Sequence, residues 1–214
     1  MRNLIDINLF LLLQYLFITL ILMYLYQGGS IAHPDANSYI VQENYLSDLG
    51  RTVLFDHENN PFWMFYTFTL ALVGMGTFLF FFILAQLQTS KKYIPIILGL
   101  ISGLGYVGIA FFQVNQRLKA HLIAGQIAYF AFFLGLISLL VYINKPVYKK
   151  IYIFIFVLAI LIAVYLLIGF LGPNSSDHIH ALHFKTLTQK ISVYSQIGIS
   201  IAILLQVKKT VYHS

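Results

Sequence analysis

The sequence has no cysteine and very few charged residues. Of its 214 residues, none is Cys, one is Trp, five are Pro, and only 9% are Asp, Glu, Lys or Arg. The absence of cysteine excludes disulfides, thiolate-bound zinc and iron–sulfur clusters. Soluble domains usually carry about 25% charged and about 45–50% apolar residues. A chain with 59% hydrophobic residues is therefore unlike a soluble domain and is typical of a membrane protein.

Long stretches without a charged residue locate the membrane spans. About 20 apolar residues, at about 1.5 Å each, cross a hydrocarbon core of about 30 Å. We predict an all-α, polytopic membrane protein, a six-transmembrane-helix bundle that forms one domain over residues 1–214. The helices are expected near residues 8–26, 62–87, 93–114, 121–143, 151–171 and 191–207. External loops are expected over residues 27–61, 115–120 and 172–190.

The positions of lysine and arginine predict the orientation, because cytoplasmic loops carry an excess of both. With six spans, both termini lie on one side of the membrane. That side carries eight of the 13 basic residues and the other side five. We therefore predict cytoplasmic termini in a multi-pass protein of the cell membrane. The formal net charge of +6 comes from residues beside apolar runs, as in proteins that meet anionic lipid, and we expect no nucleic-acid partner.

The acidic residues and histidines gather on the external side. All but one of the seven acidic residues and all but one of the seven histidines fall there: Asp35, Glu43, Asp48, Asp56, Glu58 and Asp177, with His33, His57, His121, His178, His180 and His183. The external loops 27–61 and 172–190 also exceed about 12–15 residues, a length often connected with function. We expect any chemistry at this face. The alternative is that exposed loops are polar everywhere.

The first candidate group precedes the second helix, where Ser47, Asp48, Gly50 and Arg51 fall within five positions. Asp48 would act as a general base or metal ligand, Ser47 as a nucleophile, and Arg51 would bind a lipid phosphate. The structural alternative is a turn in which Asp48 accepts from backbone amides as a cap, or pairs with Arg51.

The second candidate is His121, at the external start of the fourth helix, after Gln113, Arg117 and Lys119. We predict His121 as a catalytic residue. Gln113, Arg117 and Lys119 would bind an anionic headgroup together with Arg51. The alternative for His121 is a hydrogen-bonded residue at the membrane boundary.

The third candidate is a histidine cluster after Asp177, formed by His178, His180 and His183. Imidazole and carboxylate suit zinc and similar ions, so a divalent metal such as zinc is the possible cofactor. His180 and His183 would share a face if the segment were helical. The spacing matches no standard zinc motif, and the alternative is an amphipathic loop at the headgroups.

Two helices also carry patterns that predict packing. Gly99 and Gly103 have the small-xxx-small spacing that lets helix backbones approach closely. In the last helix, Ser192, Gln196 and Ser200 fall on one face, where hydrogen bonding between helices is the expected role. The alternatives are a bend that lines a cavity and a polar pathway.

The stretch Asn44-Tyr-Leu-Ser-Asp-Leu-Gly50 resembles the N-x-L-S-D-L-G element of the DUF998 family of six-helix prokaryotic membrane proteins. The glycine-rich third helix followed by His121 is similar to the same family, although Phe112-Gln113 stands where many members have Phe-Pro. The Frag1/DRAM/Sfk1 group is similar too. The resemblance covers about Asn44 to Ile143 and implies a shared polar set. That set is Ser47, Asp48, Gly50 and His121. The second group's link to lipid implies lipid as a partner.

Our leading hypothesis is a membrane protein with an external polar pocket that binds or processes a lipid or another amphipathic molecule. The first alternative is a metal-dependent intramembrane hydrolase that uses the histidines and Asp48 to activate water. A small transporter and a ligand-free scaffold are further alternatives. Homo-oligomers are possible through the glycine-rich helices.

Overall fold

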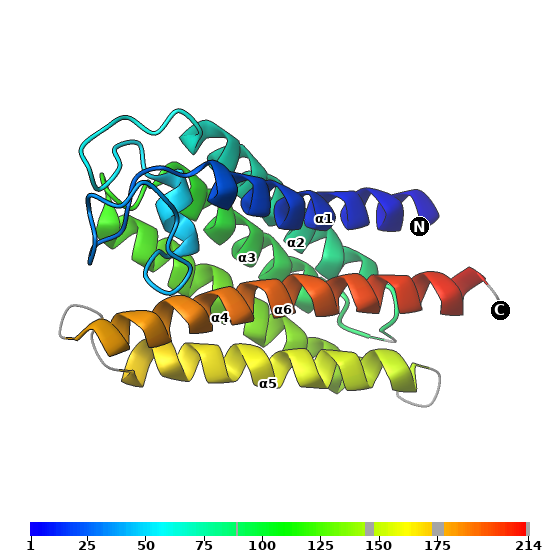
Figure 1. Ribbon diagram of the computed structural model, residues 1–214. Coiled ribbons are helices and arrows are strands. Elements are labelled where there is room, and N and C mark those ends of the chain that lie inside the picture. The colour runs from blue at the N-terminus through cyan, green and yellow to red at the C-terminus, as the bar shows by residue number, and fades with distance from the viewer. Residues whose placement is uncertain (89, 144–147, 173–177, 213–214) are drawn as a thin grey trace.

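Figure 1 shows the computed structural model of the chain, which describes residues 1–88, 90–143, 148–172 and 178–212. Within these residues the elements are α1 (Arg2–Leu25), η1 (Leu46–Gly50), α2 (Trp63–Ala85), α3 (Tyr93–Phe111), α4 (Leu118–Tyr142), α5 (Lys149–Leu171) and α6 (Ile179–Tyr212). The six α-helices of this described part are each long and apolar enough to cross a membrane. The predicted all-α bundle of membrane-spanning helices is confirmed, and the chain is a multi-pass membrane protein.

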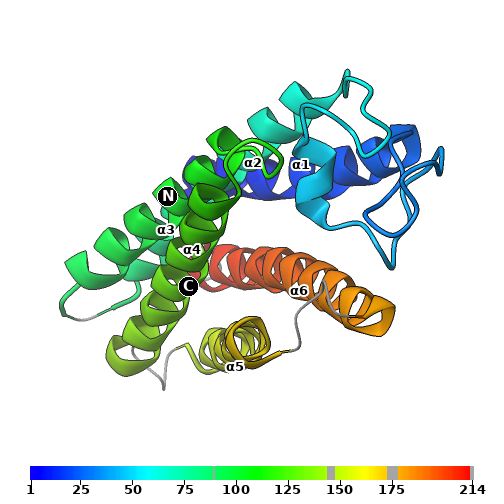
Figure 2. The ribbon, with the colours of Figure 1, turned by 90° about the vertical axis from the view of Figure 1, so that its left-hand side faces the viewer.

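The helices run along one another, and the connection between α1 and α2 covers one end of the bundle. Both termini lie at the opposite end (Figure 1). We call the covered end the loop end. Sequential neighbours pack from α1 to α4, and α6 packs against α1 and α5. Seen from the loop end, α5 lies at the edge of the bundle (Figure 2).

Apolar side chains occupy both the interior and the outer surface. Phe80, Phe81 and Phe132 are buried and contact one another edge-to-face or stacked. Large side chains such as Phe68 and Leu104 are exposed on the outside. A soluble protein rarely exposes large contiguous apolar patches, whereas lipid is a suitable solvent for such a surface.

Close packing of α3 depends on glycine, as its sequence predicts. A Cβ atom on Gly103 would lie 2.5 Å from the carbonyl oxygen of Gly74, and one on Gly74 would lie 2.6 Å from that of Gly103. On the other side of α3, a Cβ atom on Gly105 would lie 2.7 Å from the backbone of Ala128 in α4. These glycines let α3 approach both neighbours at backbone distance.

The start of α6 differs from the prediction. The last helix begins at Ile179 and not near residue 191, so most of the predicted external loop 172–190 is helical. A hydropathy pattern marks where lipid-compatible residues begin, but a helix continues through polar residues if one face stays packed. Ala181 and Leu182 provide that buried face. The 34 residues of α6 span about 50 Å, which exceeds a hydrocarbon core of about 30 Å.

The other boundaries agree to within a few residues, except at the end of α6, which continues to Tyr212 rather than residue 207, and at the start of α1. This helix begins at Arg2 rather than residue 8. Asp6 lies in the added segment, and its Oδ1 atom is 2.5 Å from Nζ of Lys208 in α6. The ion pair joins the first and last helices at the end of the bundle where both termini lie.

Candidate functional site: a tyrosine-lined cavity at the loop end

The connection between α1 and α2 is fastened to the first turns of α6. The ammonium of Lys190, whose residue is only 6% exposed, donates to the carbonyl oxygen of Asn44. The Thr186 hydroxyl donates to the carbonyl oxygen of Gln42, and the Leu46 amide donates to Oε1 of Gln189 at 2.8 Å. The extension of α6 beyond its most apolar part therefore serves as a support for this connection.

Glu43 is the buried centre of a polar cluster within the same connection. Its Oε2 atom accepts from the Ser30 hydroxyl at 2.5 Å and lies 2.8 Å from Nδ1 of His33. Nε2 of His183 in α6 lies 3.7 Å from the other carboxylate oxygen. Burial acts to raise the pKa of Glu43, but the bonds from His33 and Ser30 outweigh it and leave that pKa below its usual value.

Asp48 takes the structural role that we gave as the alternative. Its Oδ2 atom accepts from the Tyr45 amide at 2.7 Å, which caps η1, and its Oδ1 atom lies 3.7 Å from Nη1 of Arg51. The Arg51 guanidinium also lies 3.9 Å from the centre of the Phe55 ring. Burial raises the pKa of Asp48 to about 6, although Arg51 and the Tyr45 amide act in the opposite direction. Both side chains are engaged in shaping the turn.

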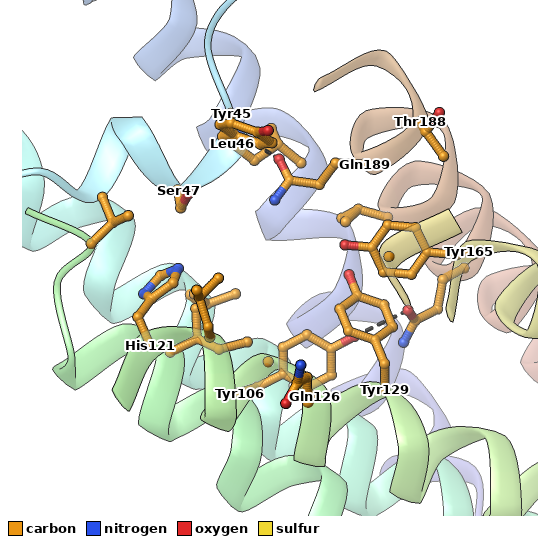
Figure 3. Close-up of a pocket in the computed structure, with 18 of the residues that line it drawn as sticks. Tyr45, Leu46, Ser47, Tyr106, His121, Gln126, Tyr129, Tyr165, Thr188 and Gln189 are labelled. Carbon is orange, nitrogen blue, oxygen red and sulfur yellow. Dashed lines mark hydrogen bonds between the residues drawn. The ribbon is translucent and has the colours of Figure 1, made fainter. Parts of the chain in front are cut away.

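Beneath η1 lies a cavity of about 530 Å³, in the half of the bundle nearest the loop end. Helices α1 to α6 all contribute to it, and η1 covers it (Figure 3). Its most distinctive lining is a set of six tyrosines, namely Tyr15, Tyr45, Tyr66, Tyr106, Tyr129 and Tyr165. The cavity therefore has aromatic walls that also carry hydroxyl groups.

Hydrogen bonds and ring contacts hold several of these tyrosines. The Tyr106 hydroxyl donates to Oε1 of Gln196 at 3.0 Å. The Tyr129 ring centroid lies 5.9 Å from that of Tyr106 and 4.7 Å from that of Tyr165. Through Gln196, the polar face of α6 makes the hydrogen bond between helices that its sequence predicts.

Two predicted site residues, Ser47 and His121, line this cavity. Figure 3 shows them on one side of it, with Tyr129 and Tyr165 on the other. Nδ1 of His121 lies 2.7 Å from the carbonyl oxygen of Phe112, so a backbone group holds the imidazole. Asp48 is not among the residues that line the cavity.

Of the four residues predicted to bind a headgroup, Gln113, Arg117 and Lys119 lie around the α3–α4 turn, and none of the four lines the cavity. The Gln113 carbonyl accepts from the Arg117 amide at 2.9 Å, and the side chains of Arg117 and Lys119 are exposed. Arg51 is held by Asp48. Instead, the basic residue that reaches the cavity lining is Lys185, on α6.

The histidine cluster does not gather into a metal site within the described ranges. His178 and His180 are exposed, and the ring of His180 lies 6.5 Å from that of His183. In the part of the chain that the structure describes, no group of three His, Asp or Glu side chains is placed to hold a metal ion. Asp177 lies outside the described residues. A zinc cofactor therefore stays a prediction.

The cavity is open on the side between α4 and α5. The buried residues of α5 all lie between Ile151 and Ile162, so the half of α5 nearest the loop end is only partly buried, although Tyr165 and Leu166 still pack against the core. Among the cavity residues in this region, Leu122 is 54% exposed and Phe170 is 65% exposed. Gln126 of α4 is exposed there as well. The cavity thus opens sideways, toward the apolar surface of the bundle.

Our sequence reasoning did not identify the tyrosines or Lys185. One signal could have found the tyrosines: several apolar helices each carry a tyrosine at a similar distance from the loop end. These are Tyr15, Tyr106, Tyr129 and Tyr165. A periodicity argument cannot separate a tyrosine that lines a cavity from one that packs in the core, because both face inward.

No family model, curated protein or solved structure matches the chain in our comparisons. The resemblance to the DUF998 family stays a prediction from the residues between Asn44 and Ile143. The function must therefore be argued from the cavity itself.

Proposed function

We propose that this protein binds an amphipathic molecule of the membrane in the tyrosine-lined cavity. In this proposal the loop end faces away from the cytoplasm and the protein lies in the cell membrane. The observation that supports the proposal most is the sideways opening of a partly polar cavity between two helices of a membrane bundle. A ligand from the bilayer can enter by that opening without crossing the loop.

The lining suits a molecule with one polar end and one apolar part. Ligand sites usually have cavities of about 300–1,000 Å³ that combine apolar walls with a few placed polar groups. Here Leu70, Val73 and Ile197 supply apolar walls. Lys185, Gln126 and Gln189 supply polar groups. A purely structural cavity would be smaller and drier, since protein interiors pack densely.

Contacts of the predicted catalytic residues favour binding over catalysis. A serine nucleophile needs an adjacent base, and the base needs a third group that orients it. Ser47 and His121 share the cavity, but Nδ1 of His121 faces the Phe112 carbonyl oxygen and not a carboxylate. Asp48 is engaged by the Tyr45 amide and Arg51. We therefore place binding before hydrolysis, transport or a scaffold role.

Glycines permit a direct test of occupancy. A Cβ atom on Gly125, in the cavity lining, would meet only Cδ1 of Ile109, at 3.9 Å, so Gly125→Leu adds volume in open space. Gly198 of α6 lies outside the lining and has no atom within 4 Å of an added Cβ, so Gly198→Leu is the matched control.

The measurement is native mass spectrometry of the protein purified in a mild non-ionic detergent. We expect an amphiphile to remain bound to the wild type and to Gly198→Leu, and to be lost from Gly125→Leu. Equal retention by all three proteins, or no bound molecule in any of them, would contradict the proposal.

A further inference from the structure

Lys185 introduces a positive charge into the cavity lining. Among the lining residues that the structure describes, Lys185 is the one Lys or Arg, and no Asp or Glu accompanies it. Two other cations of the loop end are engaged: Arg51 pairs with Asp48, and Lys190 donates to Asn44. Within the described residues, no hydrogen bond or ion pair engages the side chain of Lys185. A half-buried lysine that has no partner among the described residues favours an anion.

Gln126 is a second polar side chain of the lining that has no hydrogen-bond partner among the described residues, and it lies on α4 instead of α6. It lies on α4, two turns from the start at Leu118, and is exposed at the sideways opening. Polar side chains in a membrane helix are costly to leave unpaired, because lipid offers no hydrogen bonds. No described residue forms a hydrogen bond with the Gln126 side chain. A polar group of a ligand in the opening would satisfy it.

Apolar surface continues inward from these two groups. Leu70 and Val73 of α2 and Ile197 of α6 line the same cavity, together with the tyrosine rings. Outward, the rim is formed by exposed side chains such as Leu122 and Phe170. A hydrocarbon chain that enters from the bilayer therefore meets apolar side chains both at the opening and inside the cavity, while its polar end stays near the loop end.

We propose that the ligand is a single-chain anionic amphiphile of the long-chain fatty-acid type. Its carboxylate pairs with Lys185, and its chain lies in the cavity. This inference rests on the proposed function, because it names the chemical class of ligand for the same cavity. A whole two-chain phospholipid is too large for 530 Å³, so a single chain fits the enclosed space better.

The test measures binding of three probes that differ in one property each. Palmitate has the chain and the charge, hexadecanol has the chain without the charge, and butyrate has the charge without the long chain. Tritiated probes are bound to purified wild type, Lys185→Gln and Gly125→Leu in detergent. Lys119→Gln is the control, since Lys119 is an exposed cation outside the cavity lining.

We expect Lys185→Gln to weaken palmitate binding about tenfold, which corresponds to about 1.4 kcal/mol, and to leave hexadecanol binding unchanged. Lys185→Arg restores palmitate binding, and Lys119→Gln has no effect. Butyrate does not bind. Gly125→Leu prevents binding of both long-chain probes.

Two outcomes separate this inference from the function on which it rests. If Gly125→Leu prevents binding but Lys185→Gln binds palmitate as tightly as wild type, the cavity takes an amphiphile and the anionic class is wrong. If Gly125→Leu binds both long-chain probes as wild type does, the cavity is not the binding site and both proposals fail.

Discussion

At the scale of single residues, ionisable groups at the loop end divide into two kinds. Glu43, Asp48 and Lys190 are buried and bonded to the connection between α1 and α2 or to α6. Buried charges are tolerated when they are paired or hydrogen-bonded. Lys185 lines the cavity without such a partner in the described residues. The bonded residues therefore hold the structure around the cavity in place, whereas Lys185 is available to a ligand.

Asp48 makes stability depend on pH in a defined direction. Burial raises its pKa from 3.8 to about 6, so the folded protein holds this proton more tightly than the unfolded chain does. The stabilisation is complete below pH 3.8 and is lost as pH rises through about 6. A shift of this size corresponds to about 3 kcal/mol.

Asp48→Asn removes that titration and still offers an oxygen to the Tyr45 amide. We expect the stability of wild type relative to Asp48→Asn to fall between pH 4 and pH 7, as measured by thermal unfolding in detergent. The lowered pKa of Glu43 makes stability change with pH in the opposite direction. Because Glu43 is present in both proteins, its contribution cancels in the comparison. A constant difference between the two proteins over this pH range would show that Asp48 titrates normally.

Lys190 is expected to hold the connection between α1 and α2 in place. Lys190→Met keeps the apolar stem but removes the hydrogen bonds to Asn44 and Thr186. Since bonds to charged groups contribute about 1.5–3 kcal/mol, we expect lower thermal stability and faster tryptic cleavage at Arg51. Lys185→Met, one turn earlier, should change neither. Equal effects of the two substitutions would contradict the role of Lys190.

At the scale of elements, α3 leaves little room for added volume at its glycines. A Cβ atom on Gly103 would lie 2.5 Å from the Gly74 carbonyl oxygen, and a backbone atom cannot move aside cheaply. We expect Gly103→Ala to destabilise the protein by about 1–3 kcal/mol, the usual range for overpacking. Gly198→Ala, where nothing lies within 4 Å, is the control. Equal melting temperatures of the two variants would refute the backbone contact between α2 and α3.

The helices themselves were predictable because each stretch free of charge is long enough to cross a membrane. The extent of α6 was not, since Thr186 and Lys190 look like loop residues until their partners in the α1–α2 connection are known. The cap at Asp48 was foreseen as an alternative because its partners are local. Cavity residues such as Tyr15 and Tyr165 come from distant segments, and their convergence depends on tertiary packing.

At the scale of the whole molecule, the basic residues predict the orientation in the membrane. The chain has no cysteine, so a single introduced cysteine reports its own side of the membrane. His57→Cys lies at the exposed loop end and Lys150→Cys at the other end of the bundle. We expect a membrane-impermeant maleimide to label only His57→Cys in intact cells and both variants after lysis. The reverse pattern in intact cells would invert the proposed topology.

In our proposal, the cavity beneath η1 holds the chain of an amphiphile. The most direct measurement is an experimental structure of the protein with palmitate brominated at the end of its chain, using the anomalous signal to locate bromine. We predict bromine inside the cavity, beside Tyr129 and Ile197. Bromine found only on the outer surface, for example against the exposed ring of Phe68, would contradict the claim.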